Sequence, residues 1–327
     1  PGLMTVRGLL AAAVVAGAAS AASAEPAVVY STGGKFDASF NEAAYRGAEE
    51  WAARTGGSYA EFEPQAVGQM AQALRRFAAR GNDPVVAIGF LQAGALSEVA
   101  PEFPDTRFAI VDAVVEAPNV QSVVFKEHEG AYVVGVLAAM ASETGTVGMV
   151  GGMDIPLIRR FGCGFAQGVK SIDPDAEVLI NFAGDTPAAF SDPARGAELA
   201  RSQIDRGADV ILQAAGGTGI GVLQAAADAG VLGIGTDSNQ NGLHPGHVLT
   251  SLLKRTDVAV EEAFAFWEPG VAVLGLAEGG MTWVLDEHND ALVTEAMMET
   301  ADDVMAAIAT GAVRVHDSST EGPCPAL

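Results

Sequence analysis

The chain passes from a strand to a helix through the stretch Ala27-Val-Val-Tyr-Ser-Thr-Gly-Gly-Lys-Phe-Asp-Ala-Ser-Phe-Asn41. Its first four residues form an apolar β-type run, and residues 42–54 after it have helical periodicity. Open parallel sheets bind small ligands at the carboxyl ends of their strands, in turns of this kind. Asp37 and Asn41 bring hydrogen-bonding groups to this turn, and Phe40 brings a flat apolar face. The same residues could equally serve only to cap and pack the start of the helix.

Strand-like and helix-like segments alternate along almost the whole chain. Apolar β-type runs predict strands at 27–30, 58–62, 85–89, 108–112, 120–125, 146–150, 177–182, 209–213, 232–235, 247–251 and 281–285. Helical periodicity predicts helices at 67–80, 129–142, 157–170, 194–206, 219–229 and 255–267. This alternation is typical of α/β proteins in which helices cover both faces of parallel sheets. Because a twisted open sheet rarely exceeds about 10 strands, we expect two lobes with a ligand between them.

Three extended segments predict where the chain crosses between these lobes. They lie near residues 125–126, near residue 251 and near residue 283. Lobe 1 would then consist of residues 25–126 and 252–282. Lobe 2 would consist of residues 127–251 and 283–327, the last of which form a C-terminal tail.

Residues 1–24 have the pattern of a secretory signal peptide. Arg7 provides a positive start, and Gly8 to Ala22 form an uninterrupted run of small and apolar residues. Ala22-Ser-Ala24 then matches the small-x-small cleavage pattern, which makes Glu25 the first mature residue. The apolar run is short for a transmembrane helix. With no cysteine near the cleavage site, we expect a soluble periplasmic protein without a lipid anchor.

The mature chain is strongly acidic and poor in cysteine. Without Arg7 it has 17 basic and 41 acidic residues, a formal net charge of −24. Such a surface repels nucleic acids and anionic membranes, which we therefore exclude as partners. Cys163 and Cys324 are too few for a disulfide scaffold. They could pair in an oxidising compartment, but we expect a buried free thiol at Cys163 and a free thiol in the tail at Cys324.

Charged residues and glycines stand at the ends of other predicted strands. Asp112 and Asp237 each end an apolar run, and Lys254 follows another. Buried charges at such positions are costly unless they are paired or face a ligand. The alternative is that they are helix caps and a surface lysine. The glycine-rich turn Ala214-Ala-Gly-Gly-Thr-Gly-Ile-Gly221 allows the backbone to approach a ligand, although a tight packing turn would need the same glycines.

Sequence motifs of catalysis are absent from the printed sequence. It has no Gly-x-Ser-x-Gly elbow, no His-Glu-x-x-His pair and no phosphate loop. The glycine-rich turn lacks the third glycine of a dinucleotide fingerprint, since Val222 stands there. The five histidines have no spacing typical of a metal site. We therefore expect a binding protein, and neither an enzyme nor a cofactor or metal carrier.

Eight segments of the chain, in this order, carry a resemblance to a known family. They are Gly34-Lys-Phe-Asp-Ala-Ser-Phe-Asn41, Phe125-Lys-Glu-His-Glu-Gly-Ala-Tyr132, Gly145-Thr-Val-Gly-Met-Val-Gly-Gly152, Phe161-Gly-Cys-Gly-Phe-Ala-Gln-Gly168, Phe190-Ser-Asp-Pro-Ala-Arg-Gly196, Gly207-Ala-Asp-Val-Ile-Leu-Gln-Ala-Ala-Gly216, Gly235-Thr-Asp-Ser-Asn-Gln240 and Leu249-Thr-Ser-Leu-Leu-Lys254. From about Val28 to Val313 the chain resembles the basic membrane protein, or purine nucleoside receptor, family of substrate-binding proteins of ABC importers. It departs from the family pattern in lacking a lipobox cysteine and in having Asn239 where a second acidic residue is common.

The resemblance implies a type I periplasmic-binding-protein fold, with two Rossmann-like lobes joined by three hinge crossings. The lobes would close on a small molecule and present it to an ABC permease in the inner membrane, and we expect the receptor to be a monomer. A purine nucleoside or related base is the implied ligand. Riboflavin, a sugar or a signalling molecule on the same fold is the alternative, and a secreted Rossmann-type enzyme is the less favoured one.

The resemblance also implies roles for residues that would contact the base. Phe40 would stack on one face of the base, and Phe190, or else Phe161, would stack on the other. Asn41 would offer a donor and an acceptor to the edge of the base, and Asp112 would accept from its N–H groups.

A second group of residues would contact the ribose or shape the site. Asp237 would accept hydrogen bonds from the ribose hydroxyls, and Lys254 would donate to the same hydroxyls and partly balance the charge of Asp237. Gly216 and Gly217 would let the backbone approach the ligand. Asp37 would bind the ligand or only shape its loop.

Overall fold

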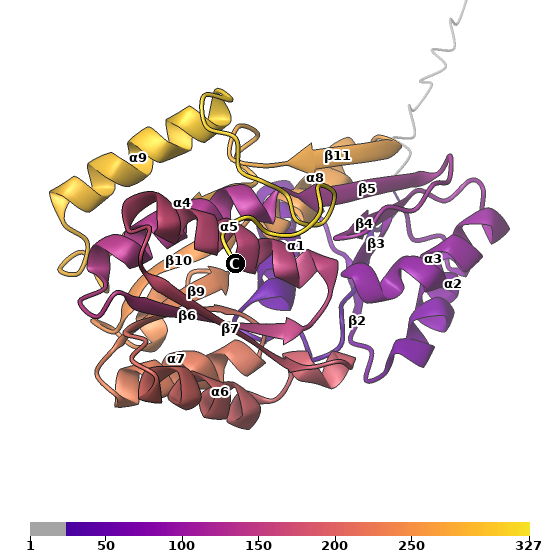
Figure 1. The fold of residues 1–327 in the computed structure, drawn as a ribbon. Helices are drawn as coiled ribbons and strands as arrows, with labels where there is room; N and C mark the ends of the chain where they lie inside the picture. The colour runs from indigo at the N-terminus through magenta and orange to yellow at the C-terminus, as the bar shows by residue number, and fades with distance from the viewer. Residues whose placement is uncertain (1–23) are drawn as a thin grey trace, which may run out of the picture.

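Two six-stranded sheets, one in each lobe, form the framework of the molecule (Figure 1). The computed structural model describes residues 24–327, so the predicted signal peptide lies outside the described part. The strand order is β11-β5-β4-β3-β1-β2 in lobe 1 and β12-β10-β9-β8-β6-β7 in lobe 2. All pairs are parallel except β10 with β12. The fold class expected from the sequence is therefore confirmed.

The strands have the following bounds. Lobe 1 contains β1 (Ala27–Val29), β2 (Ala60–Phe62), β3 (Val85–Ile88), β4 (Phe108–Val111), β5 (Val120–Phe125) and β11 (Gly270–Leu274). Lobe 2 contains β6 (Thr146–Met153), β7 (Glu177–Gly184), β8 (Val210–Ala214), β9 (Leu232–Asp237), β10 (Val248–Lys254) and β12 (Met281–Trp283).

Helices cover both faces of each sheet (Figure 1). In lobe 1, α1 (Phe40–Thr55) and α8 (Thr256–Phe266) pack on one face, and α2 (Met70–Ala79) and α3 (Ala93–Val99) on the other. In lobe 2, α4 (Glu127–Ala141) and α5 (Pro156–Ile172) pack on one face, and α6 (Pro193–Asp205) and α7 (Thr218–Asp228) on the other. The last helix, α9 (Glu295–Ala309), lies outside α4. No helix within residues 24–327 has the length and hydropathy to cross a membrane.

The apolar runs mark strands correctly because the central strands are buried on both faces. In β3, Val85 and Ala87 pack with the α2–α3 side, and Val86 and Ile88 with the α1–α8 side. All four are fully buried, so the strand has no polar alternation. The exception is β11, which the sequence did not predict. It is an edge strand, and its Val271 and Val273 are exposed. Helices α3 and α9 were also not predicted.

The chain crosses between the sheets after β5, after β10 and after β11. The crossing segments are hydrogen-bonded to one another: Lys126 N donates to Leu274 O, and Arg255 N donates to Gly280 O, both at 2.9 Å. The second and third crossings lie a few residues from their predicted positions near 251 and 283. The reason is that β10 continues to Lys254, and that β12 also belongs to the sheet of lobe 2.

The tail after α9 returns along α5 and is covalently attached to it. Cys163 of α5 and Cys324 of the tail form a disulfide, with their Cα atoms 5.6 Å apart. The expectation of two free thiols is therefore wrong. Gln167 lies one turn further along α5. Its side-chain nitrogen donates to His316 O at 3.0 Å, and its side-chain oxygen accepts from His316 N at 2.9 Å. The two cysteines are 161 residues apart in the chain, so their proximity could not be predicted from the sequence.

Helices α4 and α5 pack in backbone contact because glycines face the neighbouring helix. A Cβ atom on Gly164 would lie 2.2 Å from His128 O, and one on Gly168 would lie 2.0 Å from Tyr132 O. A Cβ on Gly135 of α4 would lie 2.3 Å from the carbonyl oxygen of Phe165. The three glycines therefore set the distance between the helices and bring the start of α4 against α5.

Replacing Gly164 by alanine should separate these helices and destabilise the protein. We expect a loss of about 1–3 kcal/mol in the free energy of unfolding, the usual cost of overpacking, measured by urea denaturation. The matched control is Gly94→Ala, since Gly94 is an exposed position of α3 with open space around it. That variant should be neutral or more stable by up to about 1 kcal/mol. Equal effects of the two substitutions would contradict the close packing.

Candidate ligand-binding site

A pocket lies between the two lobes, at the carboxyl ends of the strands of both sheets. It contains about 670 Å³ of space between atoms, part of it open to solvent. The lining residues are Ser31, Thr32, Asp37, Phe40, Asn41, Gly89, Phe90, Leu91, Asp112, Leu157, Ile158, Phe161, Phe190, Ala214, Gly216, Thr236, Asp237 and Lys254.

The structure brings nine of the ten predicted site residues to this pocket. Gly217 is the one that does not line it. Sequence reasoning missed several apolar lining residues, among them Phe90 and Leu91 after β3 and Leu157 and Ile158 at the start of α5. Phe90 directly follows a predicted strand. The rule that ligands bind at the carboxyl ends of parallel strands, which pointed to Asp112, could therefore also have found Phe90.

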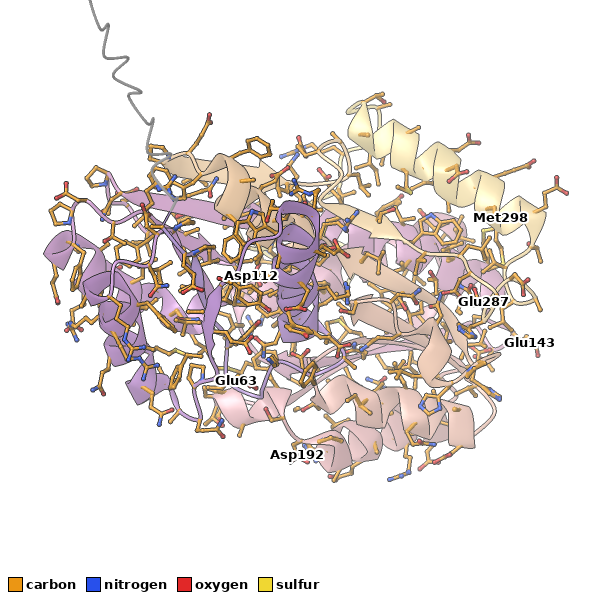
Figure 2. All side chains as sticks on the ribbon, turned by 180° about the vertical axis from the view of Figure 1, so that it is seen from behind. Glu63, Asp112, Glu143, Asp192, Glu287 and Met298 are labelled. Atoms are coloured by element: carbon orange, nitrogen blue, oxygen red, sulfur yellow. A yellow bond between two sulfur atoms is a disulfide. The ribbon has the colours of Figure 1, made fainter. Side chains whose placement is uncertain are left out.

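Lys254 is buried at the charged end of the pocket. Its side chain is 2% exposed, and its Nζ lies 2.6 Å from Asp112 Oδ1 and 2.9 Å from Glu127 Oε1. The rings of Phe40 and Phe161 lie 5.3 and 5.8 Å from the same nitrogen, within cation–π range. The ammonium therefore joins lobe 1, through Asp112, to the end of β10 in lobe 2. Figure 2 shows Asp112 in the middle of the molecule.

Asp237 has a hydrogen-bond partner that the sequence did not predict. Lys254 was expected to balance its charge in part, and the charge of Lys254 does favour ionised Asp237, but the hydrogen bond to the carboxylate comes from Ser39, whose Oγ donates to Asp237 Oδ2 at 2.6 Å. Two more bonds join the same loops across the lobes. Ser238 Oγ donates to Ser39 O at 2.6 Å, and Gln240 Nε2 donates to Ala38 O at 2.9 Å. Lobe 1 and lobe 2 are thus bonded at the edge of the pocket.

Three carboxylates, those of Asp112, Glu127 and Asp237, act on the single ammonium of Lys254. Burial raises the pKa of Asp112 to about 6, against the opposing charge of Lys254. Burial likewise raises the pKa of Asp237 to about 6, although Lys254 and the Ser39 hydroxyl favour its ionised form. Burial lowers the pKa of Lys254, but Asp112, Glu127 and Asp237 outweigh it and raise the pKa above its ordinary value. Lys254 is therefore protonated at neutral pH, and the two aspartates remain acceptors at a cost in stability.

Asn41 and Asp37 are engaged by the protein itself. The side-chain oxygen of Asn41 accepts from Ser31 N at 2.9 Å, and its amide donates to Gly34 O at 3.0 Å. Asp37 accepts from the backbone N–H groups of Ser39, Asn41 and Glu42 at 2.8, 3.0 and 3.1 Å. Both residues line the pocket and also shape the loop and the start of α1, and the role of Asn41 at the edge of a base stays a prediction.

Strained backbone is concentrated around this pocket. Within residues 24–327, the non-glycine residues with positive φ are Ala38, Asp112 and Asp237, at 58°, 69° and 70°. Such conformations cost about 1–3 kcal/mol each and are common at functional sites. Two of the three residues carry the carboxylates at the charged end. The backbone thus turns these side chains into the pocket at the ends of β4 and β9.

Four phenylalanine rings also line the pocket, and two of them, Phe40 and Phe161, lie beside the Lys254 ammonium at the charged end. Phe40 comes from α1, Phe161 from α5, and Phe90 and Phe190 from short helical turns that follow β3 and β7. The rings of Phe90 and Phe190, from opposite lobes, lie 6.3 Å apart at 65°. The pocket therefore suits a ligand with a flat apolar part and a part rich in hydrogen-bond donors.

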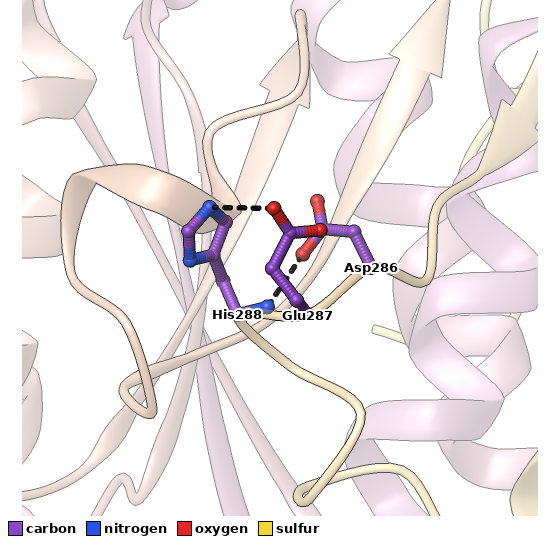
Figure 3. A group of neighbouring side chains, drawn as sticks. All are labelled: Asp286, Glu287 and His288. Atoms are coloured by element: carbon purple, nitrogen blue, oxygen red, sulfur yellow. Dashed lines mark hydrogen bonds and ion pairs between the residues drawn. The ribbon is translucent and has the colours of Figure 1, made fainter.

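A second polar cluster, Asp286, Glu287 and His288, lies in lobe 2 outside this pocket (Figure 3). One atom from each side chain lies within 4.8 Å of the others, a spacing that a metal ion could bridge. The oxygens of Asp286, however, accept from His288 N at 2.9 Å and from the amides of Asn239 and Asn241 at 2.7 and 3.2 Å. Through these bonds the three residues form a turn that holds the loop after β9 in place.

Comparison with known proteins decides the family. A model of the family described as ABC transporter substrate-binding protein PnrA-like matches residues 24–316. The chain belongs to this family. It is 32% identical over 289 residues to the ABC transporter nucleoside-binding protein BmpA of Lactococcus lactis, covering 80% of this chain and 81% of that protein. It is 32% identical over 309 residues to an uncharacterized lipoprotein of Pyrococcus abyssi, covering 86% of this chain and 76% of that one.

A solved structure has the same fold. The crystal structure of an ABC transporter solute-binding protein from Aeropyrum pernix superposes with a TM-score of 0.82 at 27% identity, covering 90% of this chain and 93% of that one. The resemblance noted from the sequence is thus confirmed. This protein is a PnrA-like substrate-binding protein of an ABC transporter, and its family implies a small-molecule ligand and a permease partner.

Replacing Asp237 by asparagine should stabilise this binding protein near neutral pH. The folded state holds the proton of Asp237 more tightly than the unfolded state, because its pKa is about 6 instead of 3.8. Ionisation therefore lowers stability as the pH rises through this range. We expect Asp237→Asn to raise the free energy of unfolding by roughly 1–3 kcal/mol at about pH 7.5, and to lose this gain at about pH 4.

Urea denaturation at both pH values measures the effect. The control is Asp286→Asn, because hydrogen bonds from Asn239, His288 and Asn241 outweigh burial and hold the pKa of Asp286 below its ordinary value. That substitution should not stabilise the protein at neutral pH. A pH-independent effect of Asp237→Asn would show that burial of its charge is not the cause.

Proposed function

We propose that this protein is a periplasmic receptor that binds a purine nucleoside between its lobes and delivers it to an ABC permease. The observation that carries the proposal is that aromatic rings and buried carboxylates line the same pocket. A nucleoside has a flat base and a ribose rich in hydroxyl donors, which match the rings and the carboxylates. The nucleoside-binding function printed for the Lactococcus lactis relative supports the same ligand class.

The base would lie among the aromatic side chains. Phe40 supplies a partly buried ring from lobe 1, and Phe190 or Phe161 supplies a ring from lobe 2. Stacking on such rings contributes about 1–3 kcal/mol per base. Because the rings come from both lobes, the base would hold the lobes together. Asp112 would accept from an N–H group of the base.

The ribose would lie at the charged end. Asp237 Oδ2 is bonded by Ser39, which leaves Oδ1 to accept from a hydroxyl of the ligand. The Lys254 ammonium has three N–H groups, two of which face Asp112 and Glu127. The third can donate to a ribose oxygen. Gly216, which has a positive φ and lines the same pocket, would allow the backbone to approach.

The composition of the pocket favours a receptor over an enzyme. Among the described residues that line it, none is a histidine or a cysteine, and its carboxylates are held by Lys254 and Ser39. A nucleophile with an adjacent base is the usual arrangement of covalent catalysis. The hinge of three bonded crossings suits a cycle of opening and closing instead.

A panel of ligands in a thermal-shift assay tests the proposal directly. Inosine, guanosine, adenosine, the free purine bases, riboflavin and pentoses would be compared at equal concentration. Binding to the folded state raises the melting temperature, and the rise grows with the ratio of the ligand concentration to Kd. We expect the purine nucleosides to give the largest shift. A larger shift with riboflavin or a pentose would replace the nucleoside by that ligand and leave the receptor role intact.

Replacing Asp237 by alanine should weaken nucleoside binding more than base binding. The substitution removes the acceptor for a ribose hydroxyl, while Lys254 keeps Asp112 and Glu127 as partners. We expect a loss of about 1.5–3 kcal/mol for the nucleoside, typical of a hydrogen bond to a charged group, and a much smaller loss for the free base. Calorimetry with both ligands gives the two values.

Ser39→Ala is the matched control for this comparison. It removes the bond across the lobes to Asp237 without removing the carboxylate. If Ser39→Ala weakens nucleoside and base equally while Asp237→Ala discriminates between them, Asp237 contacts the ribose. Equal losses for both ligands with Asp237→Ala would mean that Asp237 supports closure of the lobes or binds the base.

A further inference from the structure

A row of buried charges of alternating sign leads from the pocket to the C-terminal tail. It consists of Asp112, Lys254, Glu127, Arg160 and Asp317. The Lys254 Nζ is 2.6 Å from Asp112 and 2.9 Å from Glu127. Arg160 is 2.9 Å from Glu127 and 2.8 Å from Asp317. The row begins in lobe 1 and ends in the tail that follows α9.

Glu127 is the central member, and its two carboxylate oxygens face two different cations. It is fully buried at the first turn of α4. Oε1 accepts from Lys254, and Oε2 lies against Arg160 Nη1. Glu127 therefore lies between Lys254, which lines the pocket, and Arg160, which does not.

Arg160 is in turn held from the outer side. Its Nη1 donates to Phe125 O at 3.0 Å, and its Nη2 donates to Asp317 Oδ2 at 2.8 Å and lies 3.2 Å from His128 Nδ1. Burial and the Arg160 charge lower the pKa of His128, so its neutral ring can accept from the guanidinium. Asp317 is also fixed, because Ser319 donates to its other oxygen from both N and Oγ.

One face of α5 holds the tail through three residues. Arg160, Cys163 and Gln167 follow one another at intervals of three and four residues, so they share a helix face. They bind Asp317, Cys324 and the backbone of His316, respectively. Other α5 residues, Leu157, Ile158 and Phe161, line the pocket. The helix thus contacts the tail with one set of residues and the ligand pocket with another.

We propose that Glu127 and Arg160 are positioning residues for Lys254, and that the disulfide-anchored tail, residues 311–327, completes them through Asp317. Without Asp317, Arg160 loses its outer carboxylate and draws Glu127 away from Lys254. The ammonium then shifts toward Asp112 and away from the direction in which it would donate to a ligand. Opening the disulfide has the same effect, because it releases the segment that carries Asp317.

NMR of the lysine side chains tests the positioning without any ligand. The chain has four lysines, so ¹³Cε labelling gives few signals, and lysine-to-arginine substitutions at the other three identify that of Lys254. We expect Asp317→Asn to move the Lys254 signal. Glu321→Gln, a tail carboxylate that pairs with Arg314 outside the row, should leave it in place. An unmoved signal in Asp317→Asn overturns the inference.

The disulfide provides a second and independent variant. Cys163→Ser with Cys324→Ser, and wild-type protein under reducing conditions, should move the Lys254 signal in the same direction as Asp317→Asn. Combining the double serine variant with Asp317→Asn should add little, since both act through Arg160. Full additivity would overturn the role of the disulfide in this row.

The effect on binding rests on the proposed function and uses inosine as the probe. We expect Asp317→Asn and the double serine variant to weaken inosine binding about three- to tenfold, as is typical of coupled neighbours, with Glu321→Gln unchanged. A moved Lys254 signal with unaltered inosine affinity overturns the inference. If wild-type protein binds no nucleoside while the Lys254 signal moves as expected, the proposed function fails and the positioning of Lys254 stands.

Discussion

The burial of one ammonium group, that of Lys254, determines how the two lobes meet. Lys254 ends β10 in lobe 2, Asp112 follows β4 in lobe 1, and Glu127 begins α4 just after the first crossing. A buried charge without a partner is strongly destabilising, so none of the three can leave the others without loss. Two of the three residues lie beside the crossings, since Glu127 follows Lys126 and Lys254 precedes Arg255.

The same arrangement gives the pocket its chemistry. One ammonium serves the buried carboxylates of Asp112, Glu127 and Asp237, and burial, with a smaller contribution from the neighbouring carboxylates, raises the pKa of both aspartates. Asp112 and Asp237 also have strained backbone. Strain and unbalanced charge lower stability, and proteins retain them where binding requires it. The charged end is thus arranged for donors that a ligand brings.

Much of the candidate site could be predicted from the position of residues at strand ends. Phe40, Asp112, Asp237 and Lys254 were found in this way, because carboxyl ends of parallel strands meet at one edge. The hydrogen-bond partners could not be predicted. Asn41 lines the pocket as expected for a ligand contact, but its side chain is also bonded within its own loop, to Ser31 N and Gly34 O. Side-chain direction depends on local backbone conformation, which residue type alone does not specify.

The sequence by itself determined the α/β class, the two parallel sheets and the family, because buried strands and strand-to-helix turns leave local patterns of apolar and glycine residues. Only the tertiary structure decided that Asp237 pairs with Ser39, that Cys163 pairs with Cys324, and that β11 joins lobe 1. Each of these contacts joins residues 149 to 198 positions apart in the sequence. Such contacts depend on how helices and sheets pack in space, and packing leaves no local pattern in the chain.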